Sequence, residues 1–314
     1  MMADLARLTG GNFLVIGRAG MDLYADPPGT KVEDATRFVA HLGGSSANIA
    51  AAITRAGAKA ALMTRVSDDA VGRFVLKELD RYCIDRAYVS PNGGEARNSL
   101  AVVETRIENT QSVIYRNGAA DFLMTRADVE AVDYAGFSAL ITTGTVLAAE
   151  PSRTTTFLAF DLARAAGLPL IFDIDYRPYS WPSAHAASEV YSRAAALCDV
   201  IVGNGVEFGF LAGDPERGLK AARALVVAGA QIVVYKMGEK GAITLTPQGE
   251  VATGIYQTAA IKPTGAGDAF LGNLAAALSR GVPLREAVLR GLAAGSHCRR
   301  PRRVRPGNAD PGRA

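Results

Sequence analysis

The sequence predicts an α/β fold in which helices cover both faces of a mostly parallel β-sheet. The chain has 314 residues, 49% of them hydrophobic, so it can form one large core or two smaller ones. In its middle and C-terminal parts, short runs that are apolar throughout alternate with helical stretches of ten or more residues. Strands of that kind are buried on both faces, and the helices between them allow neighbouring strands to run parallel.

The alternation gives the expected elements in chain order. Strands are expected at residues 139–144, 168–175, 199–204 and 231–238, and helices at 153–167, 185–198 and 215–229. Gly167 would close the first of these helices. In a parallel sheet, ligands bind beyond the carboxyl ends of the strands, so residues there are the first candidates for a site.

Two segments depart from this alternation. Residues 20–42 separate the first strand from the first helix, and residues 97–118 alternate apolar and polar positions around the sequence ENT, as a hairpin does. Both segments suit a small β-sheet that projects from the main domain. The sheet would act as a lid over an active site, and an ordinary edge hairpin is the alternative.

Composition and charge exclude several classes of protein. Cys83, Cys198 and Cys298 are far apart and lack metal-site spacing, which argues for a reducing compartment and against a disulfide framework or zinc site. No apolar run reaches the length of a membrane span or a signal peptide, so a cytoplasmic location is expected. Residues 297–314 hold six arginines and one aspartate. These residues carry a net charge of +5, whereas the whole chain has a formal net charge of +3. Residues 1–296 therefore carry −2, which makes nucleic-acid binding unfavourable.

The run KPTGAGDAF, residues 262–270, carries the strongest candidate for chemistry. A glycine-rich turn before a helix exposes backbone N–H groups, and the helix adds its own free N–H groups and positive dipole end. This arrangement suits a phosphate or the charge that develops on one, with Asp268 in the first helical turn. The alternative is that Asp268 stabilises the helix N-terminus and that Gly265 and Gly267 only permit the turn.

Two further glycine-containing runs have the same kind of ambiguity. Gly43 and Gly44 open a helix whose first turns carry Asn48, so its start can face a polar ligand or can be an ordinary capped helix. Lys236 begins the run KMGEKG, residues 236–241, between two extended stretches. Its glycines would let a nucleotide lie against the backbone, or they would form a plain hairpin turn.

The order of these runs resembles the ribokinase/PfkB family of sugar kinases. The runs GRAGMD, GGSSAN, NGVE, KMGEKG and GAGD follow one another with suitable separations over residues 12–296. The resemblance implies a ribokinase-like, doubly wound α/β domain with a small β-lid, often used for dimerisation, and magnesium-ATP as the phosphoryl donor. Residues 297–314 would be an atypical basic tail, expected to be disordered.

The resemblance also implies a role for each residue that matches a family motif. Asp268 would be the catalytic base that takes the proton from the sugar hydroxyl, and Gly265, Ala266 and Gly267 would form the anion hole. Phosphoryl transfer needs chiefly alignment and charge stabilisation, which such a short set of groups can supply. The residues that match the sugar-side positions are Asp22, Gly43, Gly44 and Asn48.

The nucleotide side is implied in the same way. Asn204 and Glu207 match an Asn-x-x-Glu element that influences magnesium and phosphate binding, which makes Glu207 an indirect metal contact. Lys236, Gly238 and Gly241 match the nucleotide-side loop.

The run FDIDYRPYSWPS, residues 172–183, bears on the acceptor. It contains Asp175 and Arg177 at the end of a predicted strand, where substrate groups are expected. Arginine can hold a carboxylate with two hydrogen bonds, and the lid hairpin adds a second arginine, Arg116. Two converging arginines favour an acidic sugar over a neutral one, although surface ion pairing is an alternative for each.

Several runs are similar to one branch of the family, whose acceptor is 5-dehydro-2-deoxy-D-gluconate. These runs are DYRPYSW, YRNGAAD and IGRAGMDLYA, together with Lys262 before the GAGD turn. The implied reaction is phosphorylation of the C6 hydroxyl in inositol catabolism. The alternatives within the family are 2-keto-3-deoxygluconate kinase and a fructokinase-like sugar kinase.

Two expectations concern other classes. A sugar-acid or nucleotide sensor on a kinase scaffold is the non-enzyme alternative, but a pure binding module need not keep Asp268 in an intact GAGD turn. The tail replaces a helix and loop that the family usually places near the adenine, so weakened ATP binding is expected. The expected partners are therefore ATP and a small sugar acid, with a homodimer through the lid and no membrane.

Overall fold

The computed structural model describes residues 4–106, 109–255 and 265–297. Within these residues, nine strands form one sheet in the order β13-β12-β11-β10-β9-β8-β1-β4-β5. Strands β11 to β5 in that order run parallel, and β12 and β13 are antiparallel additions at one edge. The predicted mostly parallel sheet is therefore confirmed. The strands are β1 (Asn12–Ile16), β4 (Lys59–Ser67), β5 (Val89–Asn92), β8 (Ala139–Thr143), β9 (Leu170–Asp173), β10 (Val200–Asn204), β11 (Ile232–Lys236), β12 (Ala242–Thr246) and β13 (Gly249–Thr253).

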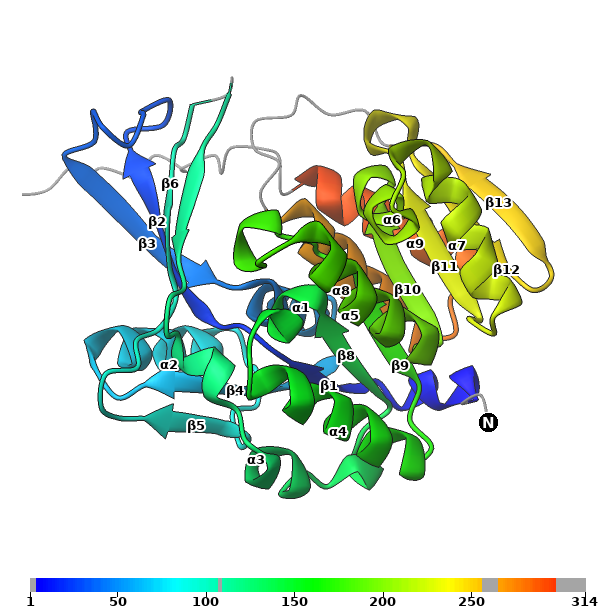
Figure 1. Ribbon diagram of the computed structural model, residues 1–314, viewed down its shortest axis with the longest axis horizontal. Helices are drawn as coiled ribbons and strands as arrows, with labels where there is room; N and C mark the ends of the chain where they lie inside the picture. Colours follow the sequence, from blue (N-terminus) through cyan, green and yellow to red (C-terminus); the bar gives the residue numbers. More distant parts are fainter. Residues whose placement is uncertain (1–3, 107–108, 256–264, 298–314) are drawn as a thin grey trace, which may run out of the picture.

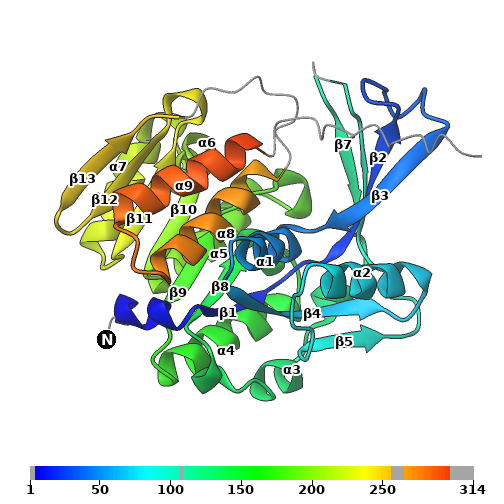
Figure 2. The same ribbon diagram turned by 180° about the vertical axis from the view of Figure 1, so that it is seen from behind.

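Helices cover both faces of this sheet (Figures 1 and 2). The helices nearer the viewer in Figure 1 are α3 (Arg126–Glu130), α4 (Ser152–Ala165), α5 (Ala184–Leu197), α6 (Gly205–Ala212) and α7 (Gly218–Val227). Those nearer the viewer in Figure 2 are α1 (Ser45–Arg55), α2 (Ala70–Arg81), α8 (Ala266–Leu278) and α9 (Leu284–His297). This two-faced cover is what the buried, apolar strands require.

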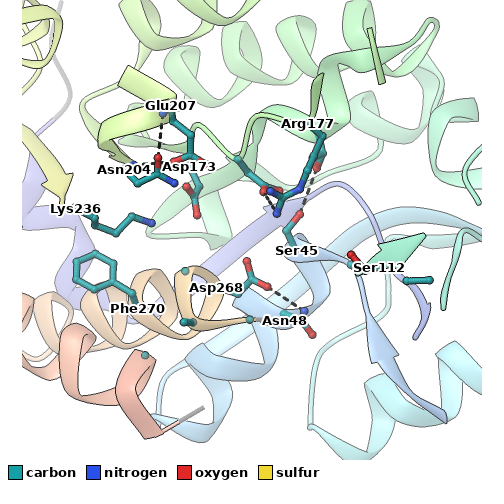
Figure 3. Close-up of a pocket in the computed structure, with 18 of the residues that line it drawn as sticks. Ser45, Asn48, Ser112, Asp173, Arg177, Asn204, Glu207, Lys236, Asp268 and Phe270 are labelled. Atoms are coloured by element: carbon teal, nitrogen blue, oxygen red, sulfur yellow. Dashed lines mark hydrogen bonds and ion pairs between the residues drawn. The ribbon is translucent and has the colours of Figure 1, made fainter. Parts of the chain in front are cut away.

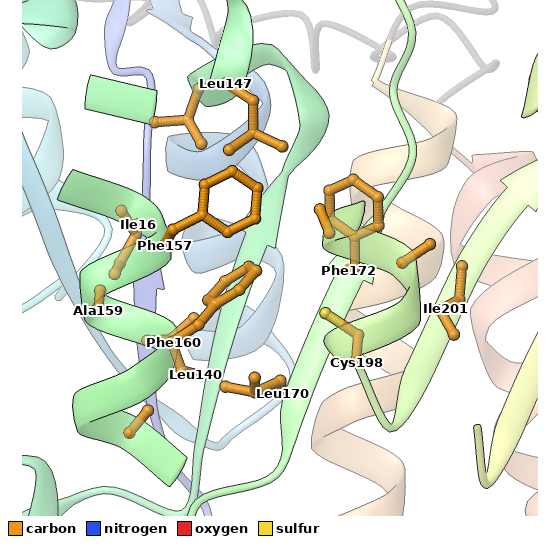
Figure 4. Close-up of a cluster of buried hydrophobic side chains, with 14 of the residues drawn as sticks. Ile16, Leu140, Leu147, Phe157, Ala159, Phe160, Leu170, Phe172, Cys198 and Ile201 are labelled. Carbon is orange, nitrogen blue, oxygen red and sulfur yellow. The ribbon is translucent and has the colours of Figure 1, made fainter. Parts of the chain in front are cut away.

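The strands inside the sheet, from β12 to β4 in the sheet order, divide their side chains between two cores. In β1, Leu14 and Ile16 join the core under α4 and α5, whereas Phe13 and Val15 join the core under α1 and α8. Because side chains alternate along a strand, an apolar run fills both cores at once. Figure 4 shows the first core, where Phe157 and Phe160 of α4 pack over the strands; its labelled strand residues are Ile16, Leu140, Leu170, Phe172 and Ile201.

A second, four-stranded sheet projects from the main domain in the order β3-β2-β6-β7. It consists of β2 (Gly20–Asp26), β3 (Arg37–Gly43), β6 (Leu100–Val103) and β7 (Ser112–Tyr115). The pairs β2–β3 and β6–β7 are antiparallel, and β2 pairs with β6 in parallel, which joins residues 79 positions apart in the chain. The two segments that break the alternation of the sequence thus come together in one small lid sheet.

The expected elements agree with the structure except at their ends. The strand expected at 168–175 spans Leu170–Asp173, and Asp175 lies beyond it with a φ of 37°, a conformation that few non-glycine residues adopt. The predicted hairpin turn includes residues 107 and 108, which are outside the described residues. The same holds for Lys262 and for the tail from residue 298.

Candidate active site

A cavity of about 1180 Å³ lies between the carboxyl ends of the parallel strands and the lid (Figure 3). The strand ends supply Asp173 from β9, Asn204 from β10 and Lys236 from β11. The first turns of α1 and α8 supply Asn48 and Asp268. The lid closes one side with Ala101, Val103, Ser112 and Ile114. The site therefore lies where a parallel α/β sheet usually binds its ligands.

The N-terminus of α8 opens into this cavity. Gly265 precedes the helix with a φ of 81°, a left-handed conformation that glycine adopts without a steric penalty. The N–H groups of Ala266, Gly267 and Asp268 have no hydrogen-bond partner among the described residues, and the first internal bond joins Ala269 N–H to the carbonyl of Gly265 at 2.9 Å. Three free amides and the helix dipole therefore face the cavity, as an anion site requires.

Asp268 stands in the first turn of α8 and accepts a hydrogen bond from Asn48 Nδ2 at 3.0 Å. Burial raises the pKa of Asp268 to about 7, and the charges of Asp175 and Asp173 contribute, although the hydrogen bond from Asn48 opposes them. A carboxylate with a pKa near neutrality can accept a proton at physiological pH far better than one near 4. The geometry and the pKa together suit a general base.

Lys236 extends from β11 toward the same helix N-terminus. Its Nζ lies 3.5 Å from the position that a Cβ on Gly267 would take, and 5.6 Å from the ring centre of Phe270. Burial alone would lower the pKa of Lys236, but the carboxylates of Asp173 and Glu207 outweigh it and hold the pKa above its usual value. An ammonium group with a secure positive charge therefore lies beside the free amides of α8.

Asn204 and Glu207 form a capping box at the N-terminus of α6. Glu207 N–H donates to Asn204 Oδ1 at 3.0 Å, and Asn204 N–H donates to Glu207 Oε2 at 2.7 Å. Glu207 is 8% exposed, and burial raises its pKa to about 7 against the opposing charge of Lys236. The Asn-x-x-Glu pattern therefore holds a helix end in place and keeps a carboxyl group at the edge of the cavity.

The residues predicted to bind the sugar lie at the base of the lid. Asp22 of β2 faces the cavity, and its Oδ1 lies 3.7 Å from Arg18 Nη2. Gly43 does not line the cavity, although a sugar contact was predicted there. A Cβ on Gly43 would overlap the Asp22 carboxylate, so its missing side chain leaves room for that group.

The two predicted carboxylate-binding arginines line the cavity, and each already pairs with an aspartate. Arg116 is held by Asp121 and donates to the carbonyl of Thr145 at 2.8 Å. Arg177 Nη2 lies 2.6 Å from Asp175 Oδ1, and this aspartate holds the pKa of Arg177 above its usual value. Both guanidinium groups keep further donors, since arginine has five N–H groups.

The structure brings together every predicted site residue except Gly43. The residues that line the cavity are Asp22, Gly44, Asn48, Arg116, Asp175, Arg177, Asn204, Glu207, Lys236, Gly238, Gly241, Gly265, Ala266, Gly267 and Asp268. Sequence reasoning missed Arg18, Asp173 and Tyr179, which also line it. Asp173 shares with Asp175 the position at a strand end and could have been found by that signal. Arg18 lies inside the GRAGMD run, but no feature of the sequence distinguishes it.

Comparison with known proteins decides the family. The model of the pfkB family of carbohydrate kinases matches residues 11–306. The chain belongs to the pfkB family of carbohydrate kinases. This kinase is 36% identical over 287 residues to a 5-dehydro-2-deoxygluconokinase from Photobacterium profundum, covering 90% of this chain and 86% of the relative.

Solved structures of the family share the fold of this kinase. A PfkB protein from Polaromonas superposes with a TM-score of 0.82 at 26% identity, covering 91% of this chain and 95% of that one. A double mutant of the fructokinase from Vibrio cholerae, solved with fructose, ADP and potassium, gives a TM-score of 0.80 at 26% identity and covers 93% of both chains. This pfkB protein is thus an ATP-dependent carbohydrate kinase with a ribokinase-like fold.

No helix among the described residues of this kinase has the length and apolar character needed to cross a bilayer.

Proposed function

We propose that this kinase transfers the γ-phosphoryl group of ATP to the C6 hydroxyl of 5-dehydro-2-deoxy-D-gluconate, a step of inositol catabolism. The observation that carries the proposal is the position of Asp268 beside three free amides of α8, in one cavity with three arginines. The relative from Photobacterium profundum is named for that acceptor, which supports the choice of sugar acid.

Asp268 would act as the general base. Its carboxylate takes the proton of the acceptor hydroxyl as the hydroxyl oxygen bonds to the γ-phosphorus, and the bond between that phosphorus and the bridging oxygen breaks to release ADP. Asn48 fixes the orientation of the carboxylate through their 3.0 Å hydrogen bond. A base whose pKa is about 7 is half ionised at neutral pH, which suits this proton transfer.

The free amides of α8 and the ammonium of Lys236 would stabilise the transferring group. A phosphoryl group in transfer spreads its charge over three oxygens, and catalysis depends mainly on positioning and electrostatic stabilisation. The amides of Ala266 to Asp268 and Lys236 Nζ converge beside Gly267, so they reach the same small volume. Bound ATP would therefore place its γ-phosphate there.

A divalent cation, which we propose to be Mg²⁺, fits the nucleotide side of the cavity. The described residues contain no group of three or more candidate ligands that could hold a metal ion. The phosphates and water would then supply most of its oxygen ligands, as is common for Mg²⁺ with nucleotides. The carboxyl groups of Glu207 and Asp173 line the same region and would contact its water shell. When bound, the ion would neutralise phosphate charge.

A coupled assay of ADP release tests the proposal directly. The assay compares 5-dehydro-2-deoxy-D-gluconate with 2-keto-3-deoxy-D-gluconate and with fructose at equal concentrations. We expect the first acid to give the highest kcat/KM, and phosphorus NMR of the product to show a phosphate on C6. A higher kcat/KM for 2-keto-3-deoxy-D-gluconate or fructose would show that the proposed acceptor is wrong. Phosphate on another carbon would show that the C6 hydroxyl is not the one that reacts.

The rate should depend on pH through Asp268. Because the ionised form is the active base, kcat/KM for the acceptor should fall as pH drops through about 7. Glu207 titrates in the same range, so Glu207→Gln serves to separate the two groups. The fall in kcat/KM with decreasing pH should persist in Glu207→Gln. A profile that is flat between about pH 5.5 and 8.5 would contradict the assignment.

We also propose that two copies of this kinase associate through their lids. β3 and β7 are the edge strands of the lid sheet, and their exposed apolar side chains are Phe38, Val39, Val113 and Tyr115. Open edges and exposed apolar side chains favour pairing with another chain. Light scattering should give the mass of a dimer for the wild type and of a monomer for Phe38→Glu. Val251→Glu, on the distant strand β13, is the control and should remain dimeric.

A further inference from the structure

Arg18 lies at the junction between the main domain and the lid and faces the cavity. It follows β1 and precedes β2. Its carbonyl accepts a hydrogen bond from Ala47 N–H, in the first turn of α1, at 3.2 Å. Its Nε donates to Ser99 Oγ at 2.6 Å, just before β6 of the lid. The backbone of Arg18 is thus fixed by the main domain, and its guanidinium group is fixed by the lid side.

The guanidinium group of Arg18 has donors that the protein does not use. Arg18 is 8% exposed. The one hydrogen bond that its guanidinium group makes to the described residues is the bond from Nε to Ser99 Oγ. Nη2 lies 3.7 Å from Asp22 Oδ1, beyond hydrogen-bond distance, and has no hydrogen-bond partner there. A buried donor without a partner destabilises the folded state, so such groups usually meet an acceptor. A ligand in the cavity can supply that acceptor.

Burial and a like-charged neighbour both act against the positive charge of Arg18, and a bound anion would relieve both. Burial lowers the pKa of Arg18, and the positive charge of Arg116 lowers it further, against the charges of Asp22 and Asp121. Arg116 is itself engaged by Asp121 and Thr145, and the side chain of Arg177 is 46% exposed and bound to Asp175. Arg18 therefore combines a buried charge, a like-charged neighbour and unused donors.

We propose that Arg18 is a specificity-determining residue of this kinase and that it donates hydrogen bonds to the carboxylate of the acceptor. This inference rests on the proposed function and deepens it, because it names the group that distinguishes a sugar acid from a neutral sugar. The carboxylate would lie at the base of the lid, beside Asp22, and the reacting hydroxyl would point toward Asp268.

The test compares the sugar acid with its neutral analogue, in which a hydroxymethyl group replaces the carboxylate. In Arg18→Gln, kcat/KM for the acid should fall by about 10- to 100-fold, the loss expected for one hydrogen bond to a charged group. The value for the neutral analogue should change by less than about threefold. Arg18→Lys keeps the charge without the planar fork and should give an intermediate loss for the acid.

Arg65→Gln is the matched control. Arg65 Nε pairs with Asp128 Oδ2 at 2.8 Å outside the cavity, so its loss also leaves a carboxylate without its arginine. Its ratio of acid to neutral kcat/KM should equal that of the wild type. Equal losses for both acceptors in Arg18→Gln, or no loss for the acid, would overturn the inference.

A binding measurement separates this inference from the proposed function. Calorimetry in an Asp268→Asn background gives the Kd of 5-dehydro-2-deoxy-D-gluconate without turnover. Adding Arg18→Gln should raise this Kd by about 10-fold or more. An unchanged Kd refutes the role of Arg18, even if the wild type is an active sugar-acid kinase. If the acid binds through Arg18 but the wild type does not phosphorylate it, the proposed function fails and the role of Arg18 stands.

Discussion

Asp268→Asn should reduce kcat by about 10²–10⁴-fold, the range expected for loss of a positioned general base. The substituted side chain keeps the size of the carboxylate, and its amide oxygen can still accept the hydrogen bond from Asn48. The Kd values of ATP and of the acceptor should therefore stay within about threefold of the wild type. Single-turnover kinetics and calorimetry measure the two effects separately. Turnover at the wild-type rate would show that Asp268 is not the base.

The same variant should be at least as stable as the wild type at pH 8. The pKa of Asp268 is raised from 3.8 to about 7 on folding, so the folded state binds more protons than the unfolded state between these values. Ionisation of Asp268 therefore lowers the free energy of unfolding as pH rises through that window, and the full cost is present above about pH 7. The Tm advantage of Asp268→Asn should disappear near pH 4. Asp161→Asn, on the exposed face of α4, is the control for the change from aspartate to asparagine itself.

Lys236→Met should lower kcat by about 10²–10³-fold, as the loss of one preorganised donor at a developing anion does. The reason is the position of Nζ beside Gly267, next to the free amides of α8. The KM of the sugar acceptor should change little, because we propose that Lys236 contacts the nucleotide phosphates and not the sugar. Rates measured at saturating ATP would show the effect, and a kcat within about threefold of the wild type would contradict it.

A second variant controls for the charge balance of this region. Lys236→Met leaves the carboxyl groups of Asp173 and Glu207 without their shared cation, so the Tm is expected to fall. Lys236→Met combined with Glu207→Gln removes one of these charges and should recover much of the Tm. If kcat recovers together with the Tm, the effect of Lys236 is structural. A low kcat at a restored Tm supports a direct contact with the transferring group.

The order of elements and the main site could be predicted from the sequence because both depend on local patterns. Apolar runs separated by helical stretches indicate a parallel sheet, and turn residues before a helix place Asp268 at its N-terminus. These properties involve residues close together in the chain, where the chemistry of each side chain decides the conformation. The match of motif order to the pfkB family then assigned the remaining positions, and fifteen of the sixteen predicted residues line the cavity.

Other features could not be found in this way because they join distant segments. Asn48 and Asp268 are 220 residues apart, and Arg18 and Ser99 are 81 residues apart, yet each pair is hydrogen-bonded. Their contacts depend on the order of strands in the sheet and on the fold of the lid, which no local pattern gives. The capping box of Asn204 and Glu207 is the opposite case, since a spacing of three residues is a recognisable helix signal.

The sequence alone determined the α/β class, the lid segments and the position of an acidic residue at a glycine-rich helix start. The tertiary structure decided which polar groups share one cavity and what charge they carry. Desolvation and neighbouring charges set a pKa, and both arise only when remote segments pack together. For this reason Asp268 appears in the sequence as an ordinary carboxylate, and only the fold gives it the pKa of a base near neutrality.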